Sequence, residues 1–528
     1  MIRSLWASLM ERLARRVDIE LHADLVGQVR DARSASDLRE VLRLQVKSTD
    51  FFAQQLPALL MELNSLNWSA LEVEKVLAYV DFFSGANARG YHRVVQNSLV
   101  RRDYLLFMTS CVYCSLADRF VEAATLLDMF QPHEDPSTDW AEYLAYAGFI
   151  NFAAGRSADL SLAYFDQALE AEYFSPSLAV NAYAIYFEAG RLAECEKLKA
   201  LIQRNCPNDS EAICALASVE LARSYYAEGF RLMEARYRLP DLARFINISL
   251  LQKPRWDRQN LSAKRLLVHG EQGLGDMIMM ARYLPLLSEQ GLELVIDGRA
   301  EACSLMTHNF PYCKFIVGNI QSPIDEPFDC WTGVMSLPYY FNTTAFNAPA
   351  VGGYLTAPVE QAAYWGQRVL GLASDVNLRV GLTWSGNPGH RADKRRSMPF
   401  ELMCSLVQKH PGIRFFSLQT HVPAGHPVNV VDIADELLTM ADTAAVMGEM
   451  DLVISVDTSA IHLAGALGRP AWLLLPHRYE WRWGLEGEAN AWYNSVRVFR
   501  QGRPGAWSEL LAKVDAELQL LSKSRTGT

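Results

Sequence analysis

Residues 451–476 constrain the fold of this chain more than any other segment. Their first part, Leu452–Val456, is an apolar run with the length of a parallel strand that is covered on both faces. Asp457 ends this run and is a favourable N-cap for a short helix over 458–467. A second apolar run follows at 471–475. The order of strand, turn, helix and strand predicts a parallel α/β sheet.

The start of this helix carries a cluster of polar side chains, from Asp457, Thr458, Ser459 and His462. In open α/β sheets ligands bind at the carboxyl ends of the strands, and the N–H groups of a helix N-terminus favour phosphate. Thr458 and His462 are four residues apart and therefore share one helix face. A plain crossover with a buried helix explains the apolar runs but not the polar cluster, so the pattern favours a phosphate-binding loop.

The same residues resemble the diphosphate loop of heptosyltransferase-like glycosyltransferases, which bind a nucleotide-sugar. The family pattern is Asp-Thr/Ser-Gly-x-x-His-x-Ala-Ala-Ala-Leu, and this chain has Ser459 in place of the glycine. The resemblance implies the GT-B fold, in which two Rossmann-like domains face each other across a cleft. It also implies a sugar donor that is activated by a nucleotide.

Length and composition are those of an ordered globular protein of about three domains. The net charge of −10 argues against a general nucleic-acid binder. Of the nine cysteines, Cys111 and Cys114 are three residues apart, but the Val-Tyr between them belongs to an apolar helical run, and no Cys/His zinc spacing is present, so we expect reduced thiols, no metal and a cytoplasmic location. No apolar window of about 18 residues predicts a membrane span, and charges interrupt the N-terminus too often for a signal peptide.

The first half of the chain is expected to be helical, because glycine and proline are sparse and apolar residues recur at spacings of three and four. A motif that ends in Ala-Ala-Gly155-Arg recurs 35 residues later as Glu-Ala-Gly190-Arg, and a weaker unit covers 215–238. These units resemble tetratricopeptide repeats, which implies a concave surface for a polypeptide. We therefore expect repeats over 138–250, preceded over 1–137 by helices that are either degenerate repeats or a separate helical domain.

After a linker at 251–262 the pattern changes to strands that alternate with helices. It predicts two Rossmann-like domains, one over 263–370 on the acceptor side and one over 375–503 on the nucleotide-sugar side. A C-terminal helix at 504–523 is expected to cross back to the first domain, as is common in the GT-B fold. The expected strands are 265–269, 292–296, 314–317 and 329–334 in the first domain, and 378–384, 414–418, 428–433, 452–456 and 471–475 in the second.

The first of these domains opens with a strand, the loop Gly-Glu-Gln-Gly-Leu-Gly-Asp276 and a helix. The glycine spacing is wrong for a dinucleotide fingerprint, and an acid at the helix start would repel phosphate. The segment resembles the Gly-Asp loop of heptosyltransferase-like enzymes, which implies that Asp276 is the base that deprotonates the acceptor. A helix cap is the alternative role for Asp276, and Glu271 and His269 are the alternative bases. Gly273 and Gly275 are candidate contacts with the substrate.

A loop rich in basic residues follows the first strand of the second domain. It contains Lys394, Arg395 and Arg396, and the resemblance implies that such a loop neutralises the departing diphosphate without a metal. The alternative is a solvated basic loop, and the sequence does not show which of the three cations points inward. Further candidate contacts with the nucleotide or the sugar are Trp384, Asn387, Gln419 and Trp481.

Helical repeats next to a heptosyltransferase-like module resemble bacterial protein glycosyltransferases, including enzymes that modify flagellin. The resemblance implies an inverting transfer of sugar from a nucleotide-sugar, which is a substrate and not a cofactor, to Ser or Thr of a protein docked on the repeats. One alternative is a transferase that builds lipopolysaccharide or another glycan, and another is a non-catalytic scaffold with a decayed module. The joint presence of Asp276, Thr458 and His462 argues against decay.

Overall fold

The computed structural model divides the chain into two compact units, Met1–Ala212 and Ile213–Thr528. The residues that it describes are 74, 75, 77, 78, 81, 82 and 87–526, without 117–118, 136–137, 172–175, 190, 206, 240–245, 259–263, 319–322, 389–392, 478–479 and 504. The helices that we expect for residues 1–73 and the turn that we expect at Gly190 lie outside the described residues.

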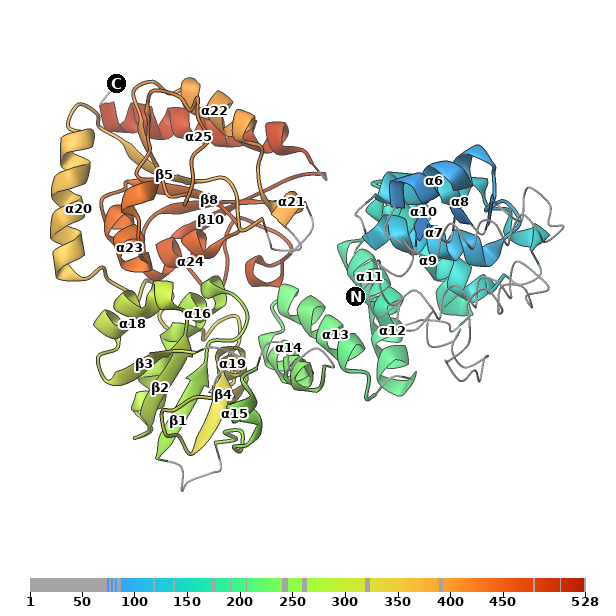
Figure 1. The fold of residues 1–528 in the computed structure, drawn as a ribbon, viewed down its shortest axis with the longest axis horizontal. Coiled ribbons are helices and arrows are strands. Elements are labelled where there is room, and N and C mark those ends of the chain that lie inside the picture. Colours follow the sequence, from blue (N-terminus) through green and yellow to red (C-terminus); the bar gives the residue numbers. More distant parts are fainter. Residues whose placement is uncertain are drawn as a thin grey trace, which may run out of the picture. The chain divides into compact units, whose positions relative to one another are not determined.

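The first unit is built from helices that pack in consecutive pairs (Figure 1). Among the described residues its helices are α6 (Asn87–Gln96), α7 (Tyr104–Leu116), α8 (Phe120–Met129), η1 (Pro132–Glu134), α9 (Trp140–Ala153), α10 (Ala158–Glu170), α11 (Pro176–Glu188), α12 (Leu192–Asn205) and the start of α13 (Ser210–Ala222). α7 packs on α8, α9 on α10 and α11 on α12, while α9 also packs on α11 of the next pair. Gly155 adopts φ +72° in the turn between α9 and α10, which confirms the expected turn there. Pair-on-pair packing is the arrangement that helical repeats produce.

The second unit begins with the remainder of α13, followed by α14 (Tyr226–Met233), the 3-10 helix η2 (Glu234–Arg238) and α15 (Ile248–Leu251). Leu250 shares an apolar core with Leu267 and Trp331 of the first sheet. The expected linker is attached to the same sheet, because the Trp256 N–H donates to the Trp331 carbonyl at 2.8 Å. These helices are therefore packed onto the α/β part of the chain.

The first sheet is parallel, with the order β3-β2-β1-β4. Its strands are β1 (Arg265–His269), β2 (Glu293–Gly298), β3 (Cys313–Val317) and β4 (Cys330–Gly333), which confirms the four expected strands to within two residues at each end. The intervening helices are α16 (Leu274–Met280), η4 (Ala281–Tyr283), α17 (Leu284–Ser288), η5 (Ala300–Ala302), α18 (Cys303–Asn309), η6 (Val334–Ser336) and α19 (Leu337–Tyr340).

The second sheet is also parallel, with the order β10-β9-β8-β5-β6-β7. Its strands are β5 (Arg379–Thr383), β6 (Arg414–Ser417), β7 (Val430–Val431), β8 (Leu452–Val456), β9 (Ala471–Leu475) and β10 (Val496–Arg500). The helices are α20 (Val359–Leu372), α21 (Asp393–Arg396), α22 (Phe400–Gln408), η7 (Ala434–Glu436), α23 (Met440–Gly448), α24 (Ser459–Ala466), η8 (Trp481–Trp483) and α25 (Trp507–Thr526). The expected Rossmann-like sheets are confirmed, although β7 is shorter than expected and β10 was not expected.

The C-terminal helix α25 packs on the second sheet, so the expectation that it crosses back to the first is wrong. Leu510, Val514 and Leu518 recur every four residues and lie in the same buried core as Val380 of β5. Lys409 of the α22 region pairs with Asp515 of α25 at 2.7 Å. Figure 1 shows α25 next to α22 on the far side of the second sheet from the first sheet.

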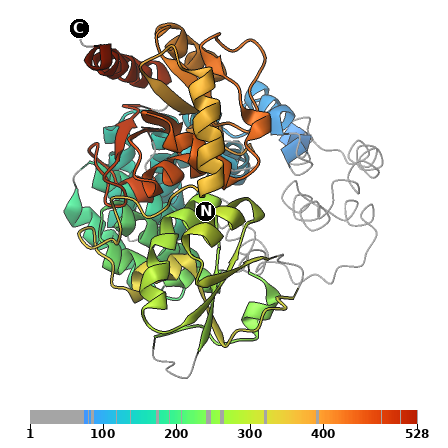
Figure 2. The ribbon, with the colours of Figure 1, turned by 90° about the vertical axis from the view of Figure 1, so that its left-hand side faces the viewer.

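The two sheets are joined where α16 packs on α24 and α18 packs on α23 (Figures 1 and 2). Arg282, which follows α16, is buried at this junction and donates from Nη1 to the Trp492 carbonyl at 2.8 Å. Its guanidinium also lies 4.8 Å from the ring centres of Tyr354 and Tyr493. The junction therefore brings the loop after β1 close to the loop after β8.

Candidate active site

Two motifs that lie far apart in the sequence meet at the contact between α16 and α24. Gly275 permits this contact, because a Cβ at that position would lie 2.7 Å from Cδ2 of His462. On α24, Gly465 plays the same part toward the ring of Tyr493. Both glycines thus serve the close packing of protein groups on one another.

Asp276 combines a helix cap with an ion pair to the opposite sheet. Its Oδ2 accepts from the Gly273 N–H at 3.2 Å, which closes the first turn of α16. Its Oδ1 accepts from Arg482 Nε at 2.8 Å and also from Nη2 of the same guanidinium. The predicted base, Asp276, is therefore buried against the guanidinium of Arg482, which lies in the segment after β9 of the second sheet.

Arg482 lies in η8, between Trp481 and Trp483. Burial lowers the pKa of Arg482, but the charges of Asp276 and Glu480 outweigh this effect and raise it, so the guanidinium stays charged. Glu480 pairs with Arg482 Nη1, yet burial raises the pKa of this carboxyl to about 7. Sequence reasoning missed Arg482, although it had indicated the neighbouring Trp481 as a candidate contact.

The loop between β8 and α24 is arranged differently from the expectation. Thr458 is the N-cap of α24, because its Oγ1 accepts from the Ala460 N–H at 3.3 Å, and Ser459 is the first helical residue. The prediction of Asp457 as the N-cap is wrong. Its Oδ1 turns away and accepts from Trp483 Nε1 at 2.9 Å, and burial raises the pKa of this carboxyl.

His462 is buried one turn into α24, with its ring against α16. Its Nδ1 lies 3.1 Å from the Tyr493 hydroxyl, and its ring centre lies 5.0 Å from that of Trp483. Burial, together with the charges of Arg482 and Arg282, holds the pKa of His462 well below its usual range. The imidazole is therefore neutral and is held between the two halves of the site.

The basic loop after β5 reaches the loop after β8 through Arg396. Its Nη1 donates to the Asp457 carbonyl at 3.2 Å, while Nε lies 3.5 Å from Asp393 Oδ1. Lys394 and Arg395 share helix α21 with Arg396, but their side chains lie outside the described part of the structure. Since β5 and β8 are neighbours where the strand order reverses, Arg396 lies where doubly wound sheets bind ligands.

The other residues that were predicted to contact the nucleotide or the sugar differ in their burial and in their hydrogen bonds. Gln419 shapes the loop, because its Oε1 accepts from the N–H groups of Trp384 and Ser385 at 3.0 and 3.1 Å. The Trp384 side chain is buried, and Asn387 is exposed. Trp481 is buried too, and its indole lies beneath the Arg482 guanidinium at 4.4 Å.

Each of the two alternative bases is held in a pair with another side chain. His269 Nδ1 lies 2.7 Å from Asp297 Oδ2. Glu271 Oε1 accepts from Arg236 Nη2 at 2.6 Å, and Arg236 comes from η2. Of the candidate bases, Asp276 is the one whose carboxylate contacts a residue of the second sheet.

Within the described ranges, no group of three or more His, Cys, Asp or Glu side chains could hold a metal ion. None of the helices in those ranges is long and apolar enough to cross a membrane.

No family model matches the chain. Among curated proteins it is similar to Protein FlbA of Caulobacter vibrioides, with 28% identity over 394 residues, which make up 68% of this chain and 64% of that protein. The chain thus spans less than two thirds of the length of this relative.

Among solved structures it is similar to E. coli ADP-heptose lps heptosyltransferase II, with 12% identity and a TM-score of 0.34 over 48% of this chain and 99% of that one. It is also similar to an O-GlcNAc transferase mutant of Thermobaculum terrenum, with 12% identity and a TM-score of 0.25 over 87% of this chain and 94% of that one.

Proposed function

We propose that the chain is a GT-B glycosyltransferase that takes a sugar from a nucleotide-activated donor. One observation carries the proposal. Asp276, which starts the first helix of one sheet, contacts Arg482 of the other sheet, next to the loop where Arg396 and the N-terminus of α24 meet. A candidate base, two cations and a helix N-terminus that favours phosphate thus converge from both sheets.

The chemistry follows from this arrangement. The hydroxyl oxygen of the acceptor attacks the anomeric carbon of the donor, and Asp276 takes the hydroxyl proton as the new bond forms. The bond between the anomeric carbon and the phosphate oxygen breaks on the face opposite to the attack, so the configuration at the anomeric carbon is inverted. Arg396, Arg482 and the N–H groups at the start of α24 stabilise the charge on the departing phosphate, a role for which no metal is required.

Asp457 and His462 have supporting roles in this proposal. Asp457 holds the loop after β8 through Trp483, and its backbone carbonyl orients Arg396. His462 fills the space between α24 and Gly275, so it keeps the donor loop against the helix that carries Asp276. Thr458 and Ser459 remain the side chains that we propose to contact the phosphates.

The acceptor is proposed to be a cytoplasmic protein that offers Ser or Thr and docks on the helical unit, with flagellin as the first candidate. A cavity of about 530 Å³ lies between α10 and α12 and suits a polar peptide because it has charged walls. Its lining residues are Asp166, Leu169, Glu170, Arg191, Glu194, Lys197, Ala200, Leu201 and Arg204. Free thiols, as cytoplasmic proteins keep them, are found at Cys111, Cys114, Cys303, Cys313, Cys330 and Cys404.

Co-expression of the chain with a candidate acceptor tests the proposal. We expect the intact mass of the acceptor to rise by one or more sugar residues with the parent chain and to stay unchanged with Asp276→Asn. Calorimetry with a panel of nucleotides then identifies the donor. An acceptor modified equally by both chains would contradict the role of Asp276, and the binding of no nucleotide would contradict the transferase itself.

A further inference from the structure

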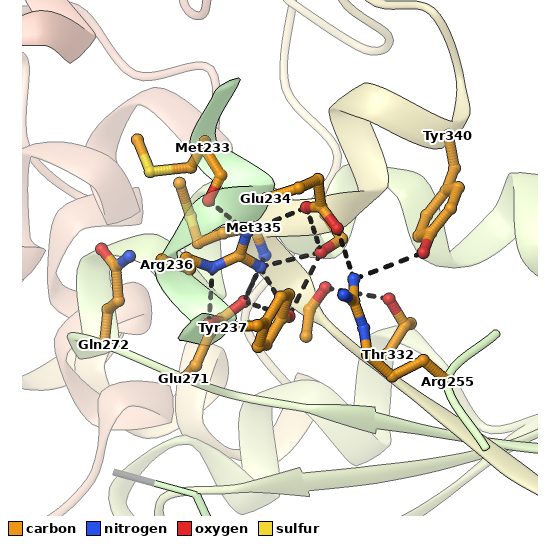
Figure 3. Close-up of polar contacts among 12 residues, drawn as sticks. Met233, Glu234, Arg236, Tyr237, Arg255, Glu271, Gln272, Thr332, Met335 and Tyr340 are labelled. Atoms are coloured by element: carbon orange, nitrogen blue, oxygen red, sulfur yellow. Dashed lines mark hydrogen bonds and ion pairs between the residues drawn. The ribbon is translucent and has the colours of Figure 1, made fainter. Parts of the chain in front are cut away.

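A buried polar network joins the helical segment of the second unit to the first sheet (Figure 3). Arg236 of η2 is buried and donates from Nε to Glu271 Oε2 at 2.9 Å and from Nη2 to Glu271 Oε1 at 2.6 Å. Nη2 also donates to Ser336 Oγ at 2.8 Å and to the Tyr237 hydroxyl at 2.6 Å. Two parallel hydrogen bonds from one guanidinium fix the orientation of the Glu271 carboxylate and also pair its negative charge.

This network lies at the point where the strand order of the first sheet reverses. Glu271 follows β1, and Ser336 follows β4, the neighbour of β1 on the side away from β2. The Met335 N–H also donates to Glu271 Oε1 at 3.2 Å. In a doubly wound sheet this position commonly holds a ligand. Here the guanidinium of Arg236 fills it from within the chain.

The loop that Arg236 holds is the one that presents Asp276. Between Glu271 and Asp276 the chain makes a tight turn, with φ +66° at Gln272, which is rare for a residue other than glycine. The turn closes when the Gly273 N–H donates to Asp276. Gln272 also accepts from Arg482 Nη2 at 3.5 Å. The placement of Asp276 thus depends on a turn whose start is fixed by Arg236.

The same helical segment also supports the residue that pairs with Asp276. Phe230 of α14 meets the ring of Trp481 edge to face, with their centres 5.8 Å apart. Tyr226 stacks on Trp492 at 5.1 Å. Since Trp481 precedes Arg482, α14 and η2 together contact both loops that form the pair between Asp276 and Arg482.

We propose that Arg236 is a positioning residue for sugar transfer, and that α14–η2 is a part of the active site which sets Asp276 against the donor loop. This inference rests on the proposed function for its kinetic consequence. It makes α14–η2, within the second unit, the element that holds the loop of the base in place. A base displaced by about 1 Å can cost roughly 100-fold in rate, because a proton transfer requires close geometry.

Arg236→Gln removes the charge, Arg236→Lys keeps it without the paired bonds, and Arg255→Gln is the matched control. Arg255 belongs to the same network and lies 3.8 Å from the centre of the Tyr237 ring, but its guanidinium bonds to Glu234 and Tyr340 rather than to Glu271. We expect Arg236→Gln to lower kcat by about 100-fold while the KM for the donor stays within about threefold. Arg236→Lys should recover part of kcat, and Arg255→Gln should keep the parental value.

Hydrogen exchange gives a second readout that needs no activity. Arg236→Gln should speed the exchange of the amides at 270–276, while Arg255→Gln should not. If Arg236→Gln fails to fold, the double variant Arg236→Gln with Glu271→Gln removes both buried charges together and takes its place. Parental kcat in a folded Arg236 variant, or unchanged exchange at 270–276, would overturn the inference. Absence of transfer by the parent chain would instead contradict the proposed function, and the exchange measurement would still decide whether Arg236 anchors the loop.

Discussion

The two sheets share one design but use their points of strand reversal differently. In the second sheet the loops after β5 and β8 meet through Arg396 and the N-terminus of α24, which leaves groups that favour an anion at the edge of the sheet. In the first sheet the loops after β1 and β4 close around Arg236 from the preceding helices. A Rossmann-like fold therefore does not by itself mark a ligand site, because the chain can supply the occupant.

Asp276 and Asp457 lie next to these points of strand reversal, and their carboxylates contact different halves of the site. The Asp276 carboxylate accepts a hydrogen bond from Arg482, which comes from the second α/β domain, so this carboxylate is turned toward the other half of the site. Asp457 also lies at the start of a helix, but it accepts from Trp483 inside its own half. Similar local sequence thus yields a candidate base in one sheet and a residue that shapes a loop in the other.

Two truncations test the comparison most severely. Removal of residues 1–250 takes away Arg236 and α14, so it should leave Glu271 as a buried charge without its partner and expose the faces of Trp481 and Trp492. A buried pair broken on one side typically costs about 3–5 kcal/mol, and the exposed aromatic rings add to this cost. We expect this truncated chain to lose cooperative thermal unfolding.

Removal of residues 1–209 is the matched experiment, because it keeps α13, α14 and η2. This shorter deletion should leave cooperative unfolding and donor binding intact and should abolish transfer to a protein acceptor. Equal stability of the two truncated chains would show that α14 and η2 are dispensable, and the contrast between the two sheets would lose its physical basis.

The pair of variants Asp276→Asn and Asp457→Asn separates the two acids. Asparagine at 276 retains the cap to Gly273 but loses both the basic oxygen and the charge that pairs with Arg482, so transfer should fall by roughly a hundredfold to ten-thousandfold. Asparagine at 457 can still accept from Trp483, so transfer should fall by less than about tenfold. Single-turnover transfer and donor calorimetry check both, and similar losses at the two positions would make the acids equivalent.

Apart from β10, the strands of both sheets were predictable because buried parallel strands are short apolar runs between turn residues. β10 escaped prediction because two arginines interrupt the apolar residues of its sequence, Val496-Arg-Val-Phe-Arg500, and because it lies at the edge of the sheet. The position of α25 was also unpredictable, since a helix with apolar residues every four positions can pack on either sheet. Only the contacts of Leu510 and Val514 decide between them.

The site was predictable where chemistry follows the local pattern of a strand, a loop and a helix. That pattern indicated Asp276, Thr458 and Ser459. It did not indicate Arg482 or Arg236, because each pairs with a residue that is distant in the sequence, and a lone arginine gives no local signal of its partner. The N-cap was misassigned because Asp457 and Thr458 both suit that position, and the indole of Trp483 decides which of them turns inward.

A methyl group at Gly275 tests whether α16 and α24 must pack as closely as they do. Gly275→Ala would place Cβ 2.7 Å from the buried imidazole of His462, so α16 must move from α24. Overpacking of this kind usually costs about 1–3 kcal/mol. Gly371→Ala is the control, since it lies in α20 with open space around it and should stabilise by about 0.5–1 kcal/mol. Denaturant unfolding of both variants checks the difference, and a gain at both positions would mean that the contact with His462 is loose.

The smallest expected effect concerns Glu480, whose charge links the two halves through Arg482. Its pKa is raised to about 7 in the folded chain, against about 4.3 in an unfolded one, so the folded state binds the proton more tightly. The stability that this proton contributes is present below pH 4.3 and is lost as pH rises toward 7.

Because Glu480→Gln imitates the protonated form, the variant should gain stability relative to the parent between about pH 5 and 7, by about 1 kcal/mol or more, and the difference should be constant above about pH 8. His462 has a lowered pKa and gives the opposite trend, with stability lost as pH falls below about 6.5, but it contributes equally to both chains and cancels in the difference. Denaturant unfolding from pH 5 to 8.5 measures this difference, and a value independent of pH would show that Glu480 is already ionised beside Arg482 throughout that range.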